Sequence, residues 1–178
     1  MATRVAVFGS SEPAPGDAEY ELARRVGRLL AEAGYEVVNG GYGGVMEGAS
    51  LGAREGGGEA VGITTRIFTR GEGNPYLSRE LPEQDLYLRT RALIEPSAAY
   101  IILPGKAGTL AELTFLWALQ RAGLLGRKPV ILVGPFWRGL VDDLLARRLL
   151  EPSQAAATAH AATPEEAVNL VRRQVIPE

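Results

Sequence analysis

The sequence predicts an α/β fold in which a doubly wound parallel sheet forms a single domain. Short runs rich in Val and Ile alternate with longer stretches of helical period along the whole chain. Two of the short runs lead through glycine-rich turns into a helix. The length of 178 residues matches one domain with a full hydrophobic core, and no repeat or low-complexity tract divides it.

Five short runs of mainly apolar residues are expected to form buried strands, because strands of a parallel sheet are apolar on both faces. They span residues 4–9, 35–38, 59–64, 99–103 and 129–134. A last strand is expected near His160. Residues 65–84 are polar and contain Gly and Pro, so we expect a long functional loop there.

Helices are expected between these strands. They span residues 20–33, 45–56, 87–94, 110–122 and 140–150. In the first of them Leu22, Val26 and Leu29 recur on one face, and Gly34 ends the helix. The run Thr163-Pro-Glu-Glu166 has the pattern of a capping box with proline at the first helical position, so it opens a final helix.

Alternating strands and helices imply right-handed crossovers, and ligands in such folds bind beyond the carboxyl ends of the strands. Two glycine-rich turns fall at this edge, in residues 40–47 and 104–112. Each leads into a helix whose first amides have no partner within the helix and whose dipole favours an anion. The pattern therefore indicates a nucleotide or sugar-phosphate site.

Composition excludes several other classes of function. The formal net charge of −2 and the pI near 5.6 give no electrostatic reason for nucleic-acid binding. Cysteine is absent, and with His160 as the one histidine we expect neither a metal site nor a Ser–His–Asp triad. No apolar run is long enough to span a membrane and no signal segment is visible, so we expect a cytoplasmic protein.

The runs Gly40-Gly-Tyr-Gly-Gly-Val-Met-Glu47 and Pro104-Gly-Lys-Ala-Gly-Thr-Leu-Ala-Glu112 resemble the two signatures of the LONELY GUY (LOG) family. The run Val7-Phe-Gly-Ser-Ser11 and the spacing from Arg89 to Pro104 also match, so the resemblance covers about residues 4–150. It implies a Rossmann-like homodimer that cleaves the N-glycosidic bond of AMP or a cytokinin nucleotide, releasing the base and ribose 5-phosphate. No cofactor is implied. Many members carry the label lysine decarboxylase, but pyridoxal phosphate needs a Schiff-base lysine, and this chain has only Lys106 and Lys128.

By residue spacing, the two catalytic residues of the family fall on Arg89 and Glu112. A carboxylate stabilises the oxocarbenium-like centre that forms when a base leaves ribose, and an arginine holds phosphate or ribose bidentately. The expected phosphate- and nucleotide-binding residues are Gly9, Ser10, Gly41, Gly43, Gly44, Met46, Glu47, Gly105, Lys106, Ala107, Gly108 and Thr109.

Several of these residues also have a purely structural interpretation. Thr109-Leu-Ala-Glu112 is itself a capping-box pattern, so Glu112 either acts in catalysis or satisfies the first amides of its helix. Arg89 is either functional or a solvated charge beside Arg91. Glu47 either touches the ligand or complements a helix dipole. Two aromatic residues, Trp117 and Trp137, are expected to pack in the core rather than to stack on a base.

The chain departs from the family signatures at Tyr42 and Lys106, which replace glycines, and at Thr90 and Tyr87, which stand where lysine and histidine are usual. These departures keep a second function open, that of a non-catalytic nucleotide-binding protein resembling molybdenum-cofactor carriers. The dimer implied by the resemblance would use the apolar helix at residues 110–125 as its interface.

Overall fold

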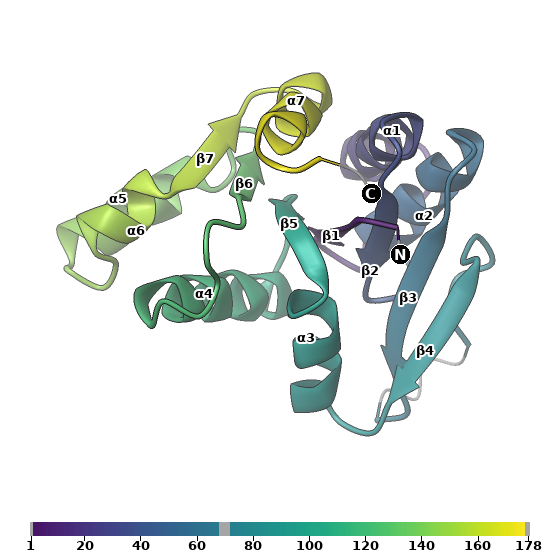
Figure 1. Cartoon of the computed structure of the whole chain (residues 1–178), viewed down its shortest axis with the longest axis horizontal. Helices are drawn as coiled ribbons and strands as arrows, with labels where there is room; N and C mark the ends of the chain where they lie inside the picture. The colour runs from purple at the N-terminus through teal and green to yellow at the C-terminus, as the bar shows by residue number, and fades with distance from the viewer. Residues whose placement is uncertain (1, 68–71, 177–178) are drawn as a thin grey trace.

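The computed structural model describes residues 2–67 and 72–176, and it contains a parallel sheet with helices on both faces (Figure 1). The strands are β1 (Arg4–Phe8), β2 (Glu36–Asn39), β3 (Ala60–Thr65), β4 (Arg79–Glu83), β5 (Ser97–Ile102), β6 (Val130–Val133) and β7 (Thr158–Ala161). Their order across the sheet is β4-β3-β2-β1-β5-β6-β7, and every neighbouring pair is parallel. The predicted doubly wound, Rossmann-like fold is confirmed.

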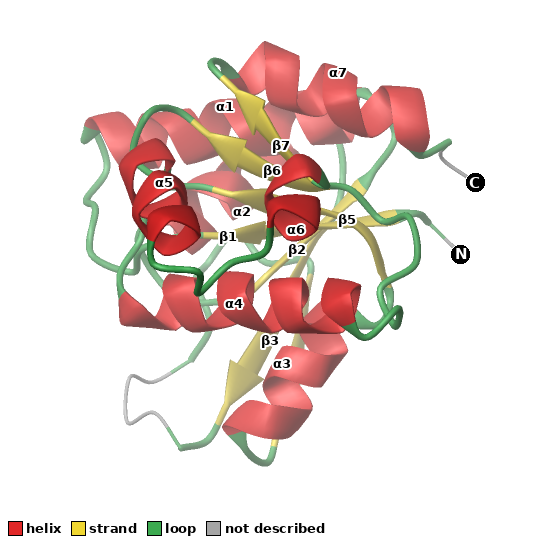
Figure 2. Cartoon of the chain, turned by 90° about the vertical axis from the view of Figure 1, so that its left-hand side faces the viewer, coloured by secondary structure: helices red, strands yellow, loops and turns green. Residues whose placement is uncertain are grey.

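The helices are α1 (Ala18–Glu32), α2 (Val45–Glu55), α3 (Leu86–Ile94), α4 (Ala107–Arg121), α5 (Arg138–Ala146), α6 (Pro152–Ala156) and α7 (Pro164–Gln174). One face of the sheet packs against α1, α2 and α7, and the other packs against α3, α4 and α5 (Figure 2). The short α6 lies beside α4 and α5. The expected helices are all present, while α6 escapes the sequence pattern because it is only one turn long.

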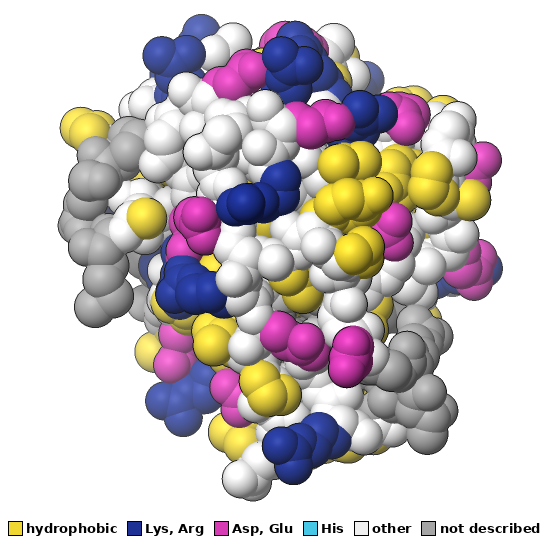
Figure 3. Space-filling model, turned by 90° about the vertical axis from the view of Figure 1, so that its right-hand side faces the viewer, with side chains coloured by type: hydrophobic (Ala, Val, Ile, Leu, Met, Phe, Trp, Pro, Cys, Tyr) yellow, Lys and Arg dark blue, Asp and Glu magenta, His cyan; other side chains and the backbone are white. Residues whose placement is uncertain are grey.

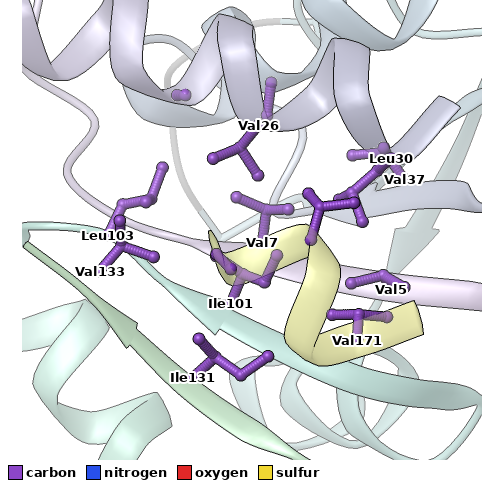
Figure 4. Packing of buried hydrophobic residues seen from close by; sticks show 14 of the residues in the cluster. Val5, Val7, Val26, Leu30, Val37, Ile101, Leu103, Ile131, Val133 and Val171 are labelled. Atoms are coloured by element: carbon purple, nitrogen blue, oxygen red, sulfur yellow. The ribbon is translucent and has the colours of Figure 1, made fainter. Parts of the chain in front are cut away.

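The continuous apolar runs of the central strands follow from this layering. In β1, Val5 and Val7 join the hydrophobic cluster beneath α1, whereas Ala6 and Phe8 join the cluster on the opposite face. Figure 4 shows Val7 and Ile101 from adjacent strands with side chains from α1 above them. Because both faces of each central strand are buried, no polar alternation marks them in the sequence.

The strand order determines where along the sheet the functional crevice lies. The chain builds outward from β1 on one side through β2, β3 and β4, and then continues with β5 on the other side of β1. The two turns that follow β1 and β5 are joined by hydrogen bonds from Leu103 N to Phe8 O at 2.9 Å and from Ser10 N to Pro104 O at 3.0 Å. Such a reversal of strand order opens a crevice beyond the carboxyl ends of the two strands.

The expectation of a loop throughout residues 65–84 is wrong, because β4 lies within it. This strand pairs with β3 along its whole length but is exposed at the sheet edge, so its sequence lacks an apolar run. It also contains Pro82, which an edge strand tolerates. Glu36 on β2 binds both Arg4 and Arg79, and this tie secures the amino end of the edge strand. Residues 68–71 of the segment lie outside the described part.

The final helix begins as predicted, since Thr163 Oγ1 accepts a hydrogen bond from Glu166 N at 3.1 Å and Pro164 occupies the first turn. His160 lies in β7, as expected.

The surface over β3, β4 and α2 carries acidic and basic side chains interspersed with one another (Figure 3). Two of the ion pairs on α1 and α2 are Arg24 with Glu55 and Arg28 with Glu32, and Arg54 on α2 pairs with Glu59 just before β3. In the described ranges, no helix combines the length and the apolar character needed to cross a membrane.

Candidate active site

A cavity of about 150 Å³ lies at the crevice between the carboxyl ends of β1 and β5. Of the residues expected at the site, the cavity is lined by Gly9, Ser10, Met46, Arg89, Lys106, Gly108, Thr109 and Glu112. Six residues absent from that set also line it, namely Val7, Phe8, Ser11, Glu12, Gly40 and Tyr42. Segments from β1, β2, α3 and α4 therefore converge on one small cavity lined by both polar and apolar side chains.

Arg89 is a buried, tightly held cation on α3, only 8% exposed. Its Nε donates to Ile63 O at 2.8 Å and its Nη2 donates to Gly40 O at 3.2 Å. Burial lowers the pKa of Arg89, and the nearby Glu112 acts against that shift. The interpretation of Arg89 as a solvated charge is wrong; that description fits Arg91, which is exposed and pairs with Glu95.

Glu112 faces Arg89 from α4, with 3.9 Å between Glu112 Oε1 and Arg89 Nη1. The Glu112 side chain is 16% exposed. Burial raises the pKa of Glu112 to about 7, and the charge of Arg89 only partly opposes this rise. The helix begins at Ala107, so Glu112 lies in its second turn, beyond the amides that a cap satisfies. The capping-box interpretation of Glu112 is therefore wrong.

The amino end of α4 lies beside this pair. The amides of Ala107, Gly108 and Thr109 belong to the first turn, and the first amide bonded back into the helix is that of Leu110, at 2.9 Å from Lys106 O. Lys106 stands at the N-cap, where it adds a positive charge to the helix dipole. Its Nζ lies 2.6 Å from Glu12 Oε2 across the mouth of the cavity.

The loop after β2 requires glycine at several positions because of its backbone conformation and its close packing, and only part of the loop contacts the cavity. Gly41 and Gly44 have φ of +81° and +68°, in the left-handed region that favours glycine, and neither lines the cavity. A Cβ on Gly40 would overlap Arg89 Nη2. Gly40 is thus a site residue that the pattern did not single out, because nothing in the sequence tells which glycine of the cluster faces the arginine.

The other expected residues lie around the cavity. Gly43 and Glu47 line an adjoining hollow of about 540 Å³, where Glu47 Oε1 accepts from Tyr20 Oη at 3.1 Å. Gly105 packs against Thr109 and borders a third hollow together with Lys106. Ala107 is exposed at the start of α4 and lines none of these spaces.

The two tryptophans pack in the core, as expected. Trp117 Nε1 donates to Thr158 Oγ1 at 2.9 Å, and Trp137 Nε1 donates to Leu103 O at 3.3 Å. Among residues 2–67 and 72–176, no group of three or more His, Asp and Glu side chains is arranged to hold a metal ion.

On its other side the Arg89–Glu112 pair borders an apolar groove of about 800 Å³ between α3 and α4. The groove shares Arg89, Gly108 and Glu112 with the cavity. Its walls include the exposed side chains of Tyr87, Phe115 and Leu124. The charged pair therefore lies at the boundary between the cavity and an apolar surface.

Comparison with known proteins gives matches over nearly the whole chain. The model of the SLOG cluster4 family matches residues 2–168. A Mycobacterium tuberculosis protein named cytokinin riboside 5′-monophosphate phosphoribohydrolase is 33% identical over 161 residues, covering 87% of this chain and 83% of that protein.

Among solved structures, the structural genomics target TM1055 is 33% identical, with a TM-score of 0.75 over 96% of this chain and 99% of that one. The molybdenum cofactor binding protein from Rippkaea orientalis has a TM-score of 0.78 over 97% of each chain. Its identity of 23% shows a shared fold alone.

Replacement of Gly40 by alanine tests the packing around Arg89. The new Cβ would overlap Arg89 Nη2 and crowd Met46 Sδ, both at the ends of flexible side chains. We expect the guanidinium to be pushed off its carbonyl acceptors and the free energy of unfolding to fall by about 1–3 kcal/mol, the usual cost of overpacking a buried site. Ligand binding or turnover at the site should fall at least tenfold.

Gly139→Ala is the matched control, because Gly139 lies in α5 with no atom within 4 Å of a new Cβ. That variant should keep full function and gain a little stability from the better helix propensity of alanine. Equal function in both variants would contradict the packing described for Arg89.

The raised pKa of Glu112 predicts a pH-dependent stability. Its value of about 7 in the folded protein lies above the ordinary 4.5, so the folded state binds the proton more tightly. The resulting stabilisation is complete below pH 4.5 and is lost as the pH rises to 7 and beyond, by roughly 1–3 kcal/mol. Urea unfolding of the wild type and of Glu112→Gln at a series of pH values measures this loss.

Glu112→Gln should lack this loss and be the more stable protein at pH 8. The exposed Glu95 offers a control, since Glu95→Gln should keep the wild-type pH profile. Parallel profiles for the wild type and Glu112→Gln would show that Glu112 does not titrate in this range.

Proposed function

We propose that this chain, which belongs to the SLOG cluster4 family, hydrolyses the N-glycosidic bond of a nucleoside 5′-monophosphate. AMP or an N6-modified AMP is the proposed substrate, and the products are the free base and ribose 5-phosphate. The observation that carries the proposal is the buried Arg89–Glu112 pair beside the amino end of α4. The name of the Mycobacterium tuberculosis relative supports the same chemistry.

In the proposed reaction Glu112 stabilises the positive charge that develops on the ribose. As the bond from C1′ to the base nitrogen breaks, its electron pair leaves with the base and positive charge develops on the ribose ring. A carboxylate in a site of low polarity stabilises this charge strongly. Water then adds its oxygen to C1′ and loses one proton, while the base gains one. Glu112 in its charged form stabilises the cation and orients the water.

The remaining groups fix the substrate. The first amides of α4 and the charge of Lys106 bind the 5′-phosphate, which displaces Glu12 from Lys106. Arg89 donates two hydrogen bonds to backbone carbonyls, which hold its guanidinium close to Glu112. A phosphate and a carboxylate held at fixed positions on one helix leave the ribose little freedom, and such positioning lowers the barrier.

A second copy of the chain is the proposed occupant of the apolar groove. The exposed side chains of Tyr87, Phe115 and Leu124 form a continuous apolar surface on α3, α4 and the turn after α4. This surface reaches Arg89 and Glu112, so a partner bound there would close the open side of the catalytic cavity. The homodimer implied by the resemblance would use this face.

One specific observation favours a second function, nucleotide binding without hydrolysis. Tyr42 fills space where the LOG signature has glycine, and the cavity holds only about 150 Å³. A protein of this kind would retain a nucleotide and release no base, which separates it from the hydrolase in a single assay.

The hydrolase proposal is tested by incubating the purified protein with AMP and N6-isopentenyl AMP and measuring free base by chromatography. Glu112→Gln and Arg89→Ala should each reduce base release by about 100-fold or more, the usual effect of removing an electrostatic catalytic group. Arg121→Ala is the control, because Arg121 lies on α4 like Glu112 but is exposed, pairs with Glu151 and lines neither the cavity nor the groove; it should keep wild-type activity.

Tight binding of both nucleotides without base release would contradict the hydrolase and support the carrier.

The dimer is tested by placing a charge in the groove. Leu124 is 75% exposed and lines the groove, so Leu124→Glu should shift the protein from dimer to monomer in sedimentation experiments at micromolar concentration. Leu149→Glu is the control, because Leu149 is 72% exposed but lies outside the groove. A monomeric wild type would rule out the proposed interface.

A further inference from the structure

We infer that Tyr42 is a positioning residue whose ring, anchored at the end of β3, holds the Arg89 guanidinium in its orientation toward Glu112. The inference rests on the proposed function for its catalytic meaning, although the contacts it concerns exist without substrate. Tyr42 stands between Gly41 and Gly43 in the loop after β2 and is only 6% exposed. A large buried side chain in the middle of a glycine-rich turn calls for a specific role.

The Tyr42 ring is fixed at its far end by two hydrogen bonds. Its hydroxyl donates to Thr65 O and accepts from Thr65 N, each at 2.9 Å. The main chain of the loop is fixed as well, because Tyr42 O accepts from Asn74 Nδ2 at 3.0 Å and Gly41 O accepts from Asn74 N at 2.8 Å. With both ends bound, the ring has no free rotation available without breaking buried hydrogen bonds.

The anchored ring lies beside the arginine. The centroid of the Tyr42 ring is 5.9 Å from Arg89 Cζ, within the range of a cation–π contact. The other contacts of the guanidinium are Ile63 O on the same strand as Thr65 and Gly40 O on the same loop as Tyr42. Arg89 and Tyr42 are thus held by the same two segments, and the ring closes a side that the carbonyls leave open.

Glu112 does not fix the guanidinium by itself. The distance of 3.9 Å between Arg89 Nη1 and Glu112 Oε1 is too long for a hydrogen bond, so this pair interacts through charge alone. Charge attraction at that distance sets no orientation. The position of the guanidinium therefore depends on the two carbonyls and on the Tyr42 ring, and removal of the ring would let the cation move away from the carboxylate.

The pKa of Glu112 depends on the position of Arg89, so a change in this pKa would reveal such a movement. The charge of Arg89 lowers the pKa of Glu112, against the upward effect of burial. The other charged side chains that line the cavity are Glu12 and Lys106, which pair with each other at 2.6 Å. Those that line the groove on the other side of Glu112 are Arg91, Glu95 and Lys128, and there Arg91 and Lys128 both contact Glu95. A displaced Arg89 should therefore raise the pH at which Glu112 titrates, whereas a general loss of packing that admits water should lower it, because burial is what raises the pKa of Glu112.

The test compares Tyr42→Leu, Tyr42→Phe and Tyr35→Leu. Tyr35 is a buried tyrosine in the hydrophobic cluster beneath α1, and its hydroxyl donates to Val175 O at 2.6 Å. Tyr35→Leu therefore controls for the loss of a buried ring. For each protein the pH dependence of urea unfolding gives the titration midpoint of Glu112. Base release from AMP gives kcat and KM where activity is present.

Tyr42→Leu should raise the midpoint by about 0.5–1 pH unit, a part of the full effect of a neighbouring opposite charge. It should also lower kcat by roughly 10- to 100-fold, the range expected for a misplaced catalytic group. Tyr42→Phe keeps the ring and should show a smaller shift. Tyr35→Leu should lose stability with the midpoint unchanged.

A midpoint in Tyr42→Leu equal to that of the wild type would overturn the inference, whatever happens to kcat. If the wild type releases no base from any nucleotide, the proposed function fails, yet the shift of the Glu112 midpoint still decides whether Tyr42 positions Arg89.

Discussion

Burial of the Arg89 charge is the constraint on which the rest of the site depends. A guanidinium taken out of water needs hydrogen-bond acceptors for its donors. Backbone carbonyls of Ile63 and Gly40 accept two of its hydrogen bonds, and the Glu112 carboxyl faces it at 3.9 Å. The end of β3, the loop after β2 and the second turn of α4 all have to meet at this one side chain.

Topology makes that meeting possible. The reversal of strand order at β1 and β5 leaves a crevice, and the chain enters α4 directly from it. The helix then offers its free amides to the crevice in its first turn and Glu112 one turn later. The Glu112 carboxylate is desolvated there, so its charged form lowers the stability of the fold. The proposed chemistry nevertheless requires Glu112 in that charged form.

The sequence alone predicted much of this, for identifiable reasons. Continuous apolar runs marked the central strands because both of their faces are buried, whereas β4 was missed because an edge strand needs no such run. Arg89 and Glu112 were found through their spacing to the glycine motifs of a resembling family. The structure brings them together at 3.9 Å, and their catalytic role stays a prediction.

Other features depend on which atoms meet in space. Gly40 was indistinguishable from its neighbouring glycines, although it alone of that loop would place a Cβ against Arg89. Tyr42 was visible only as a departure from a signature, and its contact with Arg89 arises from the packing of β3 against the loop. Long-range packing of this kind leaves no local pattern in a sequence.

The central claim is that the charged pair and the amino end of α4 form one nucleotide site. A crystal structure of Glu112→Gln with AMP tests it most directly. We expect the phosphate within hydrogen-bond distance of the amides of residues 107–109 and C1′ beside residue 112. AMP bound with its phosphate away from α4, or with its ribose remote from residues 89 and 112, would show that these groups do not form one site.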